Sequence, residues 1–161
     1  MFGKIRHTDF PPTKKPQMVW DGECGFCRYW VTYWKSNTAD RIDYCPYQES
    51  ASSYLDFPVK EFKKASRLIE TDGSIYSGPD SAFRSFRYFD PPNKFWHQLY
   101  SENKIFRFGC QHIYNFIAKH RSLMLKITFL FFGKNPKSLK LYWFLYILLL
   151  IVLISLATWF L

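Results

Sequence analysis

The sequence predicts an α/β fold, a mixed sheet with flanking helices, followed by one C-terminal transmembrane helix. Three observations lead to this fold class. Short apolar runs of strand length alternate with segments of helical periodicity. The dipeptide at 72–73, Asp-Gly, joins two such runs as in a β-hairpin. The final segment, Leu141 to Leu161, contains no charged residue, proline or glycine.

The first predicted strand and helix follow a polar N-terminal arm, residues 1–15, which lacks the apolar stretch of a secretory signal. Residues 16–20 form a short apolar run, typical of a buried strand, and end at a turn. A helical pattern starts near Cys24 and ends in the polar residues after its aromatic face. That face consists of Phe26, Trp30, Tyr33 and Trp34.

The second strand and the segment after it are shorter. Residues 42–45 alternate apolar and polar side chains, as in a half-buried strand, and Pro46 closes the run. Residues 49–62 predict a helix and a loop, interrupted around Pro58. A strand, a helix and a second strand therefore occupy the first part of the chain.

A hairpin and further helices complete the predicted domain. Residues 67–71 and 74–77 predict two strands, and the Asp-Gly turn between them favours type I′ geometry. Residues 78–90 predict a helix that prolines terminate, and Lys104 to Lys119 has apolar side chains at helical spacing. A strand–helix–strand unit followed by a hairpin and a helix is the thioredoxin-like layout.

The C-terminal part is apolar and basic. Residues 123–132 are too short to span a bilayer; we expect either an amphipathic helix at the membrane interface or a last helix packed on the domain. Leu141 to Leu161 would be roughly 30 Å long as a helix, the thickness of a bilayer core. We therefore expect this segment to anchor the protein in the membrane.

Charge predicts how the anchored protein is oriented. The formal net charge is +9, and no acidic residue follows Glu102. Three lysines, Lys134, Lys137 and Lys140, precede the apolar segment. By the positive-inside rule they keep the preceding domain in the cytoplasm. Because the same lysines flank a predicted membrane helix, we expect no nucleic-acid partner.

The residues that indicate chemistry are Cys24 and Cys27, at the predicted junction of strand and helix. Two thiols at i and i+3 can close and reopen a disulfide. The unpaired N–H groups and dipole at a helix N-terminus stabilise a thiolate. In a reducing compartment such a pair is typical of a catalytic or metal-binding site. The spacing therefore favours thiol–disulfide exchange.

Each residue of this motif has a predicted role. Cys24, nearest the helix start, is the expected nucleophile, and Cys27, one turn inward, is the expected resolving thiol. For Asp21 two interpretations stay open. It accepts a proton from Cys27 during resolution, or it ends the strand and caps the helix through the turn.

These motifs resemble the thiol-disulfide oxidoreductase DCC family, which is thioredoxin-like. The resemblance covers roughly residues 18–121 and rests on the following segments: Asp21-Gly22-x-Cys24-x-x-Cys27, Cys45-Pro46-Tyr47-Gln48, residues 72–78 and residues 113–121. It implies disulfide oxidoreductase activity, with a disulfide-containing protein or small molecule as substrate. It names neither the substrate nor the electron donor.

The four cysteines allow other kinds of site. Cys45 and Cys110 are expected to be bystanders. A zinc site that combines them with the motif cysteines and His112 lacks a second closely spaced ligand pair. Haem attachment requires a histidine after the second cysteine, where Arg28 stands. We therefore expect no cofactor, and the alternative function is a thioredoxin-like interaction or metal-binding module of a membrane complex.

The chain thus divides into four predicted segments. They are a polar arm at 1–15, a thioredoxin-like domain at 16–121, a basic juxtamembrane segment at 122–140 and a transmembrane helix at 141–161.

Overall fold

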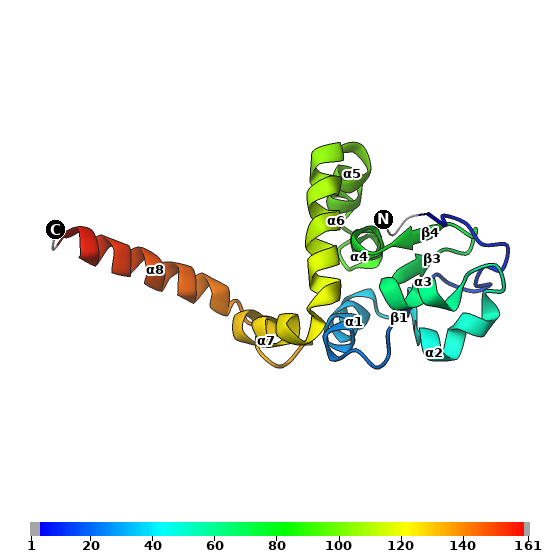
Figure 1. Ribbon diagram of the computed structural model, residues 1–161, viewed down its shortest axis with the longest axis horizontal. Coiled ribbons are helices and arrows are strands. Elements are labelled where there is room, and N and C mark those ends of the chain that lie inside the picture. The colour runs from blue at the N-terminus through cyan, green and yellow to red at the C-terminus, as the bar shows by residue number, and fades with distance from the viewer. Residues whose placement is uncertain (1–3, 160–161) are drawn as a thin grey trace.

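The computed structural model describes residues 4–159 and has the predicted α/β architecture, a four-stranded mixed sheet with helices around it (Figure 1). The strands are β1 (Gln17–Trp20), β2 (Asp43–Pro46), β3 (Arg67–Ile69) and β4 (Ile75–Ser77). The α-helices are α1 (Gly25–Thr38), α2 (Tyr47–Ser50), α3 (Val59–Lys64), α4 (Pro79–Ser85), α5 (Phe95–Glu102), α6 (Lys104–Lys119), α7 (Arg121–Phe132) and α8 (Tyr142–Trp159). Two short 3₁₀ helices are η1 (Ala51–Ser53) and η2 (Phe86–Tyr88).

The sheet has the order β2-β1-β3-β4. β1 and β2 run parallel, because α1 carries the chain from the end of one to the start of the other. β3 lies antiparallel to β1 on its other side, and the hairpin adds β4 at the edge. The first strand is thus central, so the turn that follows it opens at the middle of the sheet.

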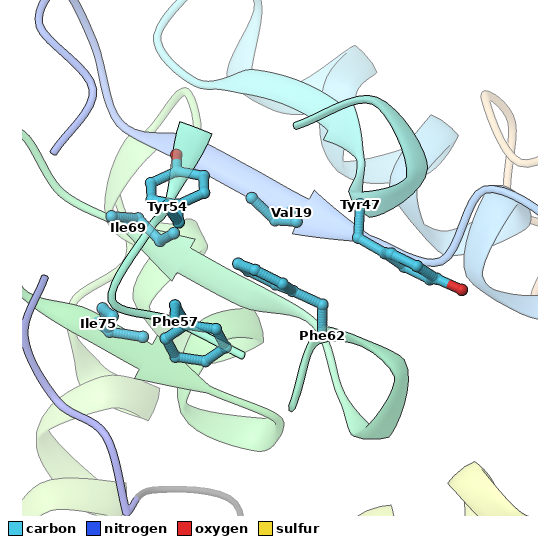
Figure 2. Close-up of a cluster of buried hydrophobic side chains, with 7 residues drawn as sticks. All are labelled: Val19, Tyr47, Tyr54, Phe57, Phe62, Ile69 and Ile75. Carbon is cyan, nitrogen blue, oxygen red and sulfur yellow. The ribbon is translucent and has the colours of Figure 1, made fainter. Parts of the chain in front are cut away.

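Alternation along β1 places apolar side chains on both faces of the sheet. Val19 belongs to a cluster on one face, and its neighbour Met18 packs with Ile42 and Leu68 on the other. Figure 2 shows the first cluster, in which side chains from β1, β3 and β4 meet aromatic rings from the segment between β2 and β3. It consists of Val19, Tyr47, Tyr54, Phe57, Phe62, Ile69 and Ile75. Both faces of the short sheet are therefore covered.

The hairpin forms at the predicted place, but its turn differs from the prediction. The N–H of Gly73 donates to the carbonyl of Glu70 (3.1 Å), and the N–H of Glu70 donates to the carbonyl of Ser74 (2.9 Å). Gly73 has a φ of 84°, whereas Asp72 is not among the described residues with positive φ. The loop therefore has three residues and ends in a left-handed glycine. The Asp72 carboxylate accepts the N–H of Ser74 (2.8 Å) within this loop.

α7 packs on the domain. Its Phe129 ring lies 5.7 Å from that of Tyr29, and its Phe132 ring lies 5.6 Å from that of Trp30. Of the two arrangements expected for residues 123–132, this is the packed helix. Leu123 and Leu130 on the same helix are about half exposed.

α8 extends away from the domain and packs against α7 at its N-terminal end (Figure 1). The prediction of a transmembrane helix at Leu141 to Leu161 is not supported, since no helix within the described residues combines the length and apolar character needed to cross a membrane. The helix observed there is α8, which is 18 residues long within the described residues. Residues 160 and 161 lie outside the described part.

Candidate active site

The two motif cysteines lie where β1 ends and α1 begins. Cys24 is the N-cap of α1, with extended backbone (φ −87°, ψ 110°), and its carbonyl accepts the N–H of Arg28 (2.9 Å). Its Sγ accepts the backbone N–H of Cys27 at 3.2 Å. A sulfur atom thus takes the place of the oxygen that usually caps a helix. The predicted helix start at Cys24 is confirmed.

The environment separates the acidities of the two thiols. The pKa of Cys24 is lowered to about 6. The largest cause is a hydrogen bond from the Cys27 side chain; the backbone N–H of Cys27 and the charge of Arg121 act in the same direction, and burial opposes them. The pKa of Cys27 is raised, first by its hydrogen bond to Cys24, then by burial and by the negative charge of Cys24. At neutral pH, Cys24 is the thiolate and Cys27 the thiol.

Arg121 supplies the positive charge of the site. It begins α7, and its Nη1 donates to Asp21 Oδ2 at 2.7 Å while its Nη2 donates to the carbonyl of Lys63 at 3.0 Å. The guanidinium is about three-quarters buried, so water screens its charge incompletely. In the sequence, Arg121 stands out only as the last residue of the segment 113–121, and it was not predicted to be a site residue.

Asp21 is hydrogen-bonded through both carboxylate oxygens. Oδ2 pairs with Arg121, and Oδ1 accepts Gln48 Nε2 at 3.1 Å and the N–H of Glu23 at 3.3 Å. Gln48 in turn accepts the N–H of Gly22 through its Oε1 (3.1 Å). The carboxylate therefore orders the turn before α1 and holds the guanidinium, whereas the helix cap is Cys24.

The backbone before β3 is hydrogen-bonded from within the chain. The N–H of Ser66 donates to the Tyr114 hydroxyl (3.2 Å), and the carbonyl of Ser66 accepts the N–H of Gly78 (2.9 Å). The hydroxyl of Ser66 lies 2.9 Å from that of Ser81. α6 and α4 thereby fix this segment against the site.

A cavity of about 200 Å³ lies beside Cys27, between α1, α4 and α6. Its wall is mostly apolar and aromatic, and Asp21, Cys27 and Arg121 contribute the charged and sulfur groups. Of the predicted catalytic residues, Asp21 and Cys27 line this cavity, and Cys24 lies next to it through its contact with Cys27. No pattern in the sequence indicated it, because its wall comes from segments far apart in the chain.

The other two cysteines lie outside this wall. Cys45 is on β2, with its Sγ 3.9 Å from Glu49 Oε2, and Cys110 is on α6. Burial raises the pKa of each. Among residues 4–159, no group of three or more His, Cys, Asp and Glu side chains is arranged to hold a metal ion.

The chain resembles a known protein family over the region that contains the site. Residues 18–126 match the family model of DCC1-like thiol-disulfide oxidoreductases. The chain belongs to this family. The resemblance inferred from the motif is thereby confirmed, and so is a thiol–disulfide redox role in general. Comparison with curated proteins and with solved structures gave no match.

The region that matches the DCC1-like family model includes the whole candidate site. The matched region begins before Asp21 and ends after Arg121, so it contains both cysteines, the ion pair and every segment that lines the cavity. The mixed four-stranded sheet fits the thioredoxin-like fold expected for this family.

Proposed function

We propose that the protein exchanges disulfides through Cys24 as nucleophile and Cys27 as resolving thiol, and that it reduces protein or small-molecule disulfides. One observation carries this assignment. The Cys24 sulfur accepts the Cys27 N–H at the start of α1, and the pKa values of the two thiols are displaced in opposite directions. A thiolate and a neutral thiol one helical turn apart are what the two steps need.

The reaction balances in two steps. The Cys24 thiolate attacks one sulfur of the substrate disulfide, forms a mixed disulfide, and releases the other sulfur as a thiolate that takes a proton from water. Cys27 then loses its proton and attacks the Cys24 sulfur, which releases the second substrate thiol. The enzyme ends as the Cys24–Cys27 disulfide, and a dithiol reductant returns it to the starting state.

Arg121 and Asp21 support the first step in this proposal. The guanidinium stabilises the thiolate of Cys24, and the Asp21 carboxylate positions the guanidinium. Support for positioning comes from the three hydrogen bonds that Asp21 accepts, because they fix the carboxylate against the guanidinium.

Turnover of bis(2-hydroxyethyl) disulfide, with dithiothreitol as reductant, tests the roles of the cysteines. Cys24→Ser should abolish turnover, because the attacking thiolate is gone. Cys27→Ser should still attack and should accumulate a mixed disulfide visible by mass spectrometry. The opposite phenotypes would exchange the two roles, and full activity in both variants would exclude the proposal.

Membrane attachment, with the domain facing the cytoplasm, is part of the same proposal. Side chains along α8 are apolar and about half exposed, such as Ile147 at 48% and Leu149 at 57%. Lys134, Lys137 and Lys140 lie just before this helix and suit the anionic lipids of the cytoplasmic leaflet. Flotation with vesicles that contain or lack phosphatidylserine tests it; protein that floats with neither vesicle would exclude attachment.

A further inference from the structure

The cavity beside Cys27 has the size of one aromatic ring with a substituent. Its volume is about 200 Å³. An engineered apolar protein cavity of about 150 Å³ binds benzene. Three indole rings contribute to its wall, those of Trp20, Trp30 and Trp34. An apolar ring that leaves water for such a wall gains hydrophobic and ring-packing free energy.

The wall also offers polar groups. Asp21, Cys27 and Arg121 form the charged and sulfur-bearing part of the wall. An occupant therefore has apolar surroundings with the resolving cysteine, Cys27, in the wall.

A polypeptide would find no free backbone at Ser66, which also lines the cavity. A peptide docks on a protein edge by pairing its main chain with unoccupied N–H and C=O groups. Here the N–H of Ser66 donates to Tyr114 and its carbonyl accepts from Gly78. These contacts favour a small molecule over an extended peptide as the occupant.

We propose that this cavity binds the apolar, ring-sized part of a small-molecule disulfide while Cys24 attacks the adjoining sulfur. The inference rests on the proposed function and adds the substrate class. Cys27 lines the cavity, and its N–H donates to the Cys24 sulfur at 3.2 Å, so a ring in the cavity lies one residue contact away from the attacking thiolate.

The bond changes follow the two steps given above. The thiolate of Cys24 attacks the sulfur that carries the ring, and the sulfur–sulfur bond of the substrate breaks. The polar half leaves as a thiolate and takes a proton from water. Cys27 then attacks Cys24 and releases the ring-bearing thiol. Two electrons pass from the enzyme dithiol to the substrate, and dithiothreitol reduces the enzyme disulfide.

Two mixed disulfides of similar intrinsic reactivity test the proposal: benzyl 2-hydroxyethyl disulfide and methyl 2-hydroxyethyl disulfide. The full-length protein should show a kcat/KM that is roughly 10- to 100-fold higher for the benzyl compound, the value expected for burying one ring. A ratio near one with both compounds turned over would overturn this inference and leave the proposed function standing. No turnover of either would overturn both.

Variants that fill the cavity sharpen the test. Ala118→Leu and Ala82→Leu each add side-chain volume at the wall, and each should lower the benzyl-to-methyl ratio at least about fivefold. Lys119→Leu, an exposed position on the same helix as Ala118, is the matched control and should keep the ratio. A ratio that the filling variants leave unchanged, in proteins with wild-type circular dichroism, would overturn the inference.

Binding and substrate source have separate readouts. Benzyl alcohol should change the tryptophan fluorescence of the unmodified protein and inhibit turnover of the methyl compound competitively, because three of the six tryptophans line the cavity. Disulfide-linked Phe-Cys and Gly-Cys peptides, compared as substrates, test whether a peptide can supply the ring. A preference for the Phe-Cys peptide as large as that for the benzyl compound would overturn the assignment to small molecules.

Discussion

The start of α1 and the exposed helix α8 differ in how much of their surface the rest of the chain contacts. At the start of α1, Cys24, Asp21 and Arg121 are joined by contacts between segments up to 100 residues apart. On α8, apolar side chains stand about half exposed, the Tyr146 hydroxyl donates to the carbonyl of Leu130, and the Ser155 hydroxyl donates to the carbonyl of Ile151. Contacts within the chain build the first surface, whereas the second is the apolar surface to which we assign membrane attachment.

The largest expected effect concerns membrane attachment through α8. Leu145→Glu combined with Leu149→Glu puts two charges on one face of α8 and should weaken binding to phosphatidylserine vesicles by at least roughly 100-fold. Flotation measures it. Leu55→Glu with Val59→Glu, equally spaced and also exposed, is the matched control and should still float. Equal binding by both double variants would refute attachment through α8.

A smaller effect is expected at the ion pair. Arg121→Ala removes a positive charge that, after the hydrogen bond from Cys27, helps to lower the pKa of Cys24. The thiolate fraction at pH 7 should fall about two- to tenfold. Rates of iodoacetamide alkylation should rise with a midpoint near pH 6 in the unmodified protein and at higher pH in the variant. Arg121→Lys should shift the midpoint less, and an unshifted midpoint in Arg121→Ala contradicts the assigned role.

Asp21→Asn separates the two roles considered for this carboxylate, and a few-fold change is expected. Besides the hydrogen bond to Cys24 and burial, the Asp21 charge contributes to the raised pKa of Cys27. A positioning role therefore predicts resolution by Cys27 that is no slower in the variant. Stopped-flow fluorescence of the mixed disulfide measures this step. Resolution slowed tenfold or more, with the pH dependence lost, would instead make Asp21 the proton acceptor.

The smallest effect is expected for the cysteines away from the site. Cys45→Ala and Cys110→Ala should each change turnover by less than about twofold, because neither sulfur lines the cavity and burial raises both pKa values. The disulfide turnover assay compares them with Cys24→Ser. A loss comparable to that of Cys24→Ser would extend the site beyond the α1 start.

The sequence predicts local features of this fold well. The start of α1 at Cys24 and the helix from Lys104 to Lys119 follow from capping and periodicity, which act over a few residues. The predicted type I′ turn was wrong, because Gly73 has a positive φ and Asp72 is not among the described residues that do. The α/β class followed from element order.

The rest of the site depends on contacts that no short pattern records. Arg121 reaches Asp21 across 100 residues, and Tyr114 reaches Ser66 across 48. The cavity exists only because α1, α4 and α6 leave space between them. The prediction of a transmembrane span at the C-terminus is not supported within the described residues.

The sulfur cap of α1 links protonation to folding. Cys24 loses its proton near pH 6 in the folded protein, and an ordinary thiol in the unfolded chain does so near 9.0. The unfolded chain thus binds more protons in this window, so the free energy of unfolding of the dithiol form rises with pH between about 6 and 9 and loses that contribution as the pH falls through 6. The pKa of Cys27 is raised in the folded protein, so this thiol changes the free energy of unfolding only above about pH 9. The disulfide form has no thiolate at position 24, so the two redox states differ in how their stability responds to pH.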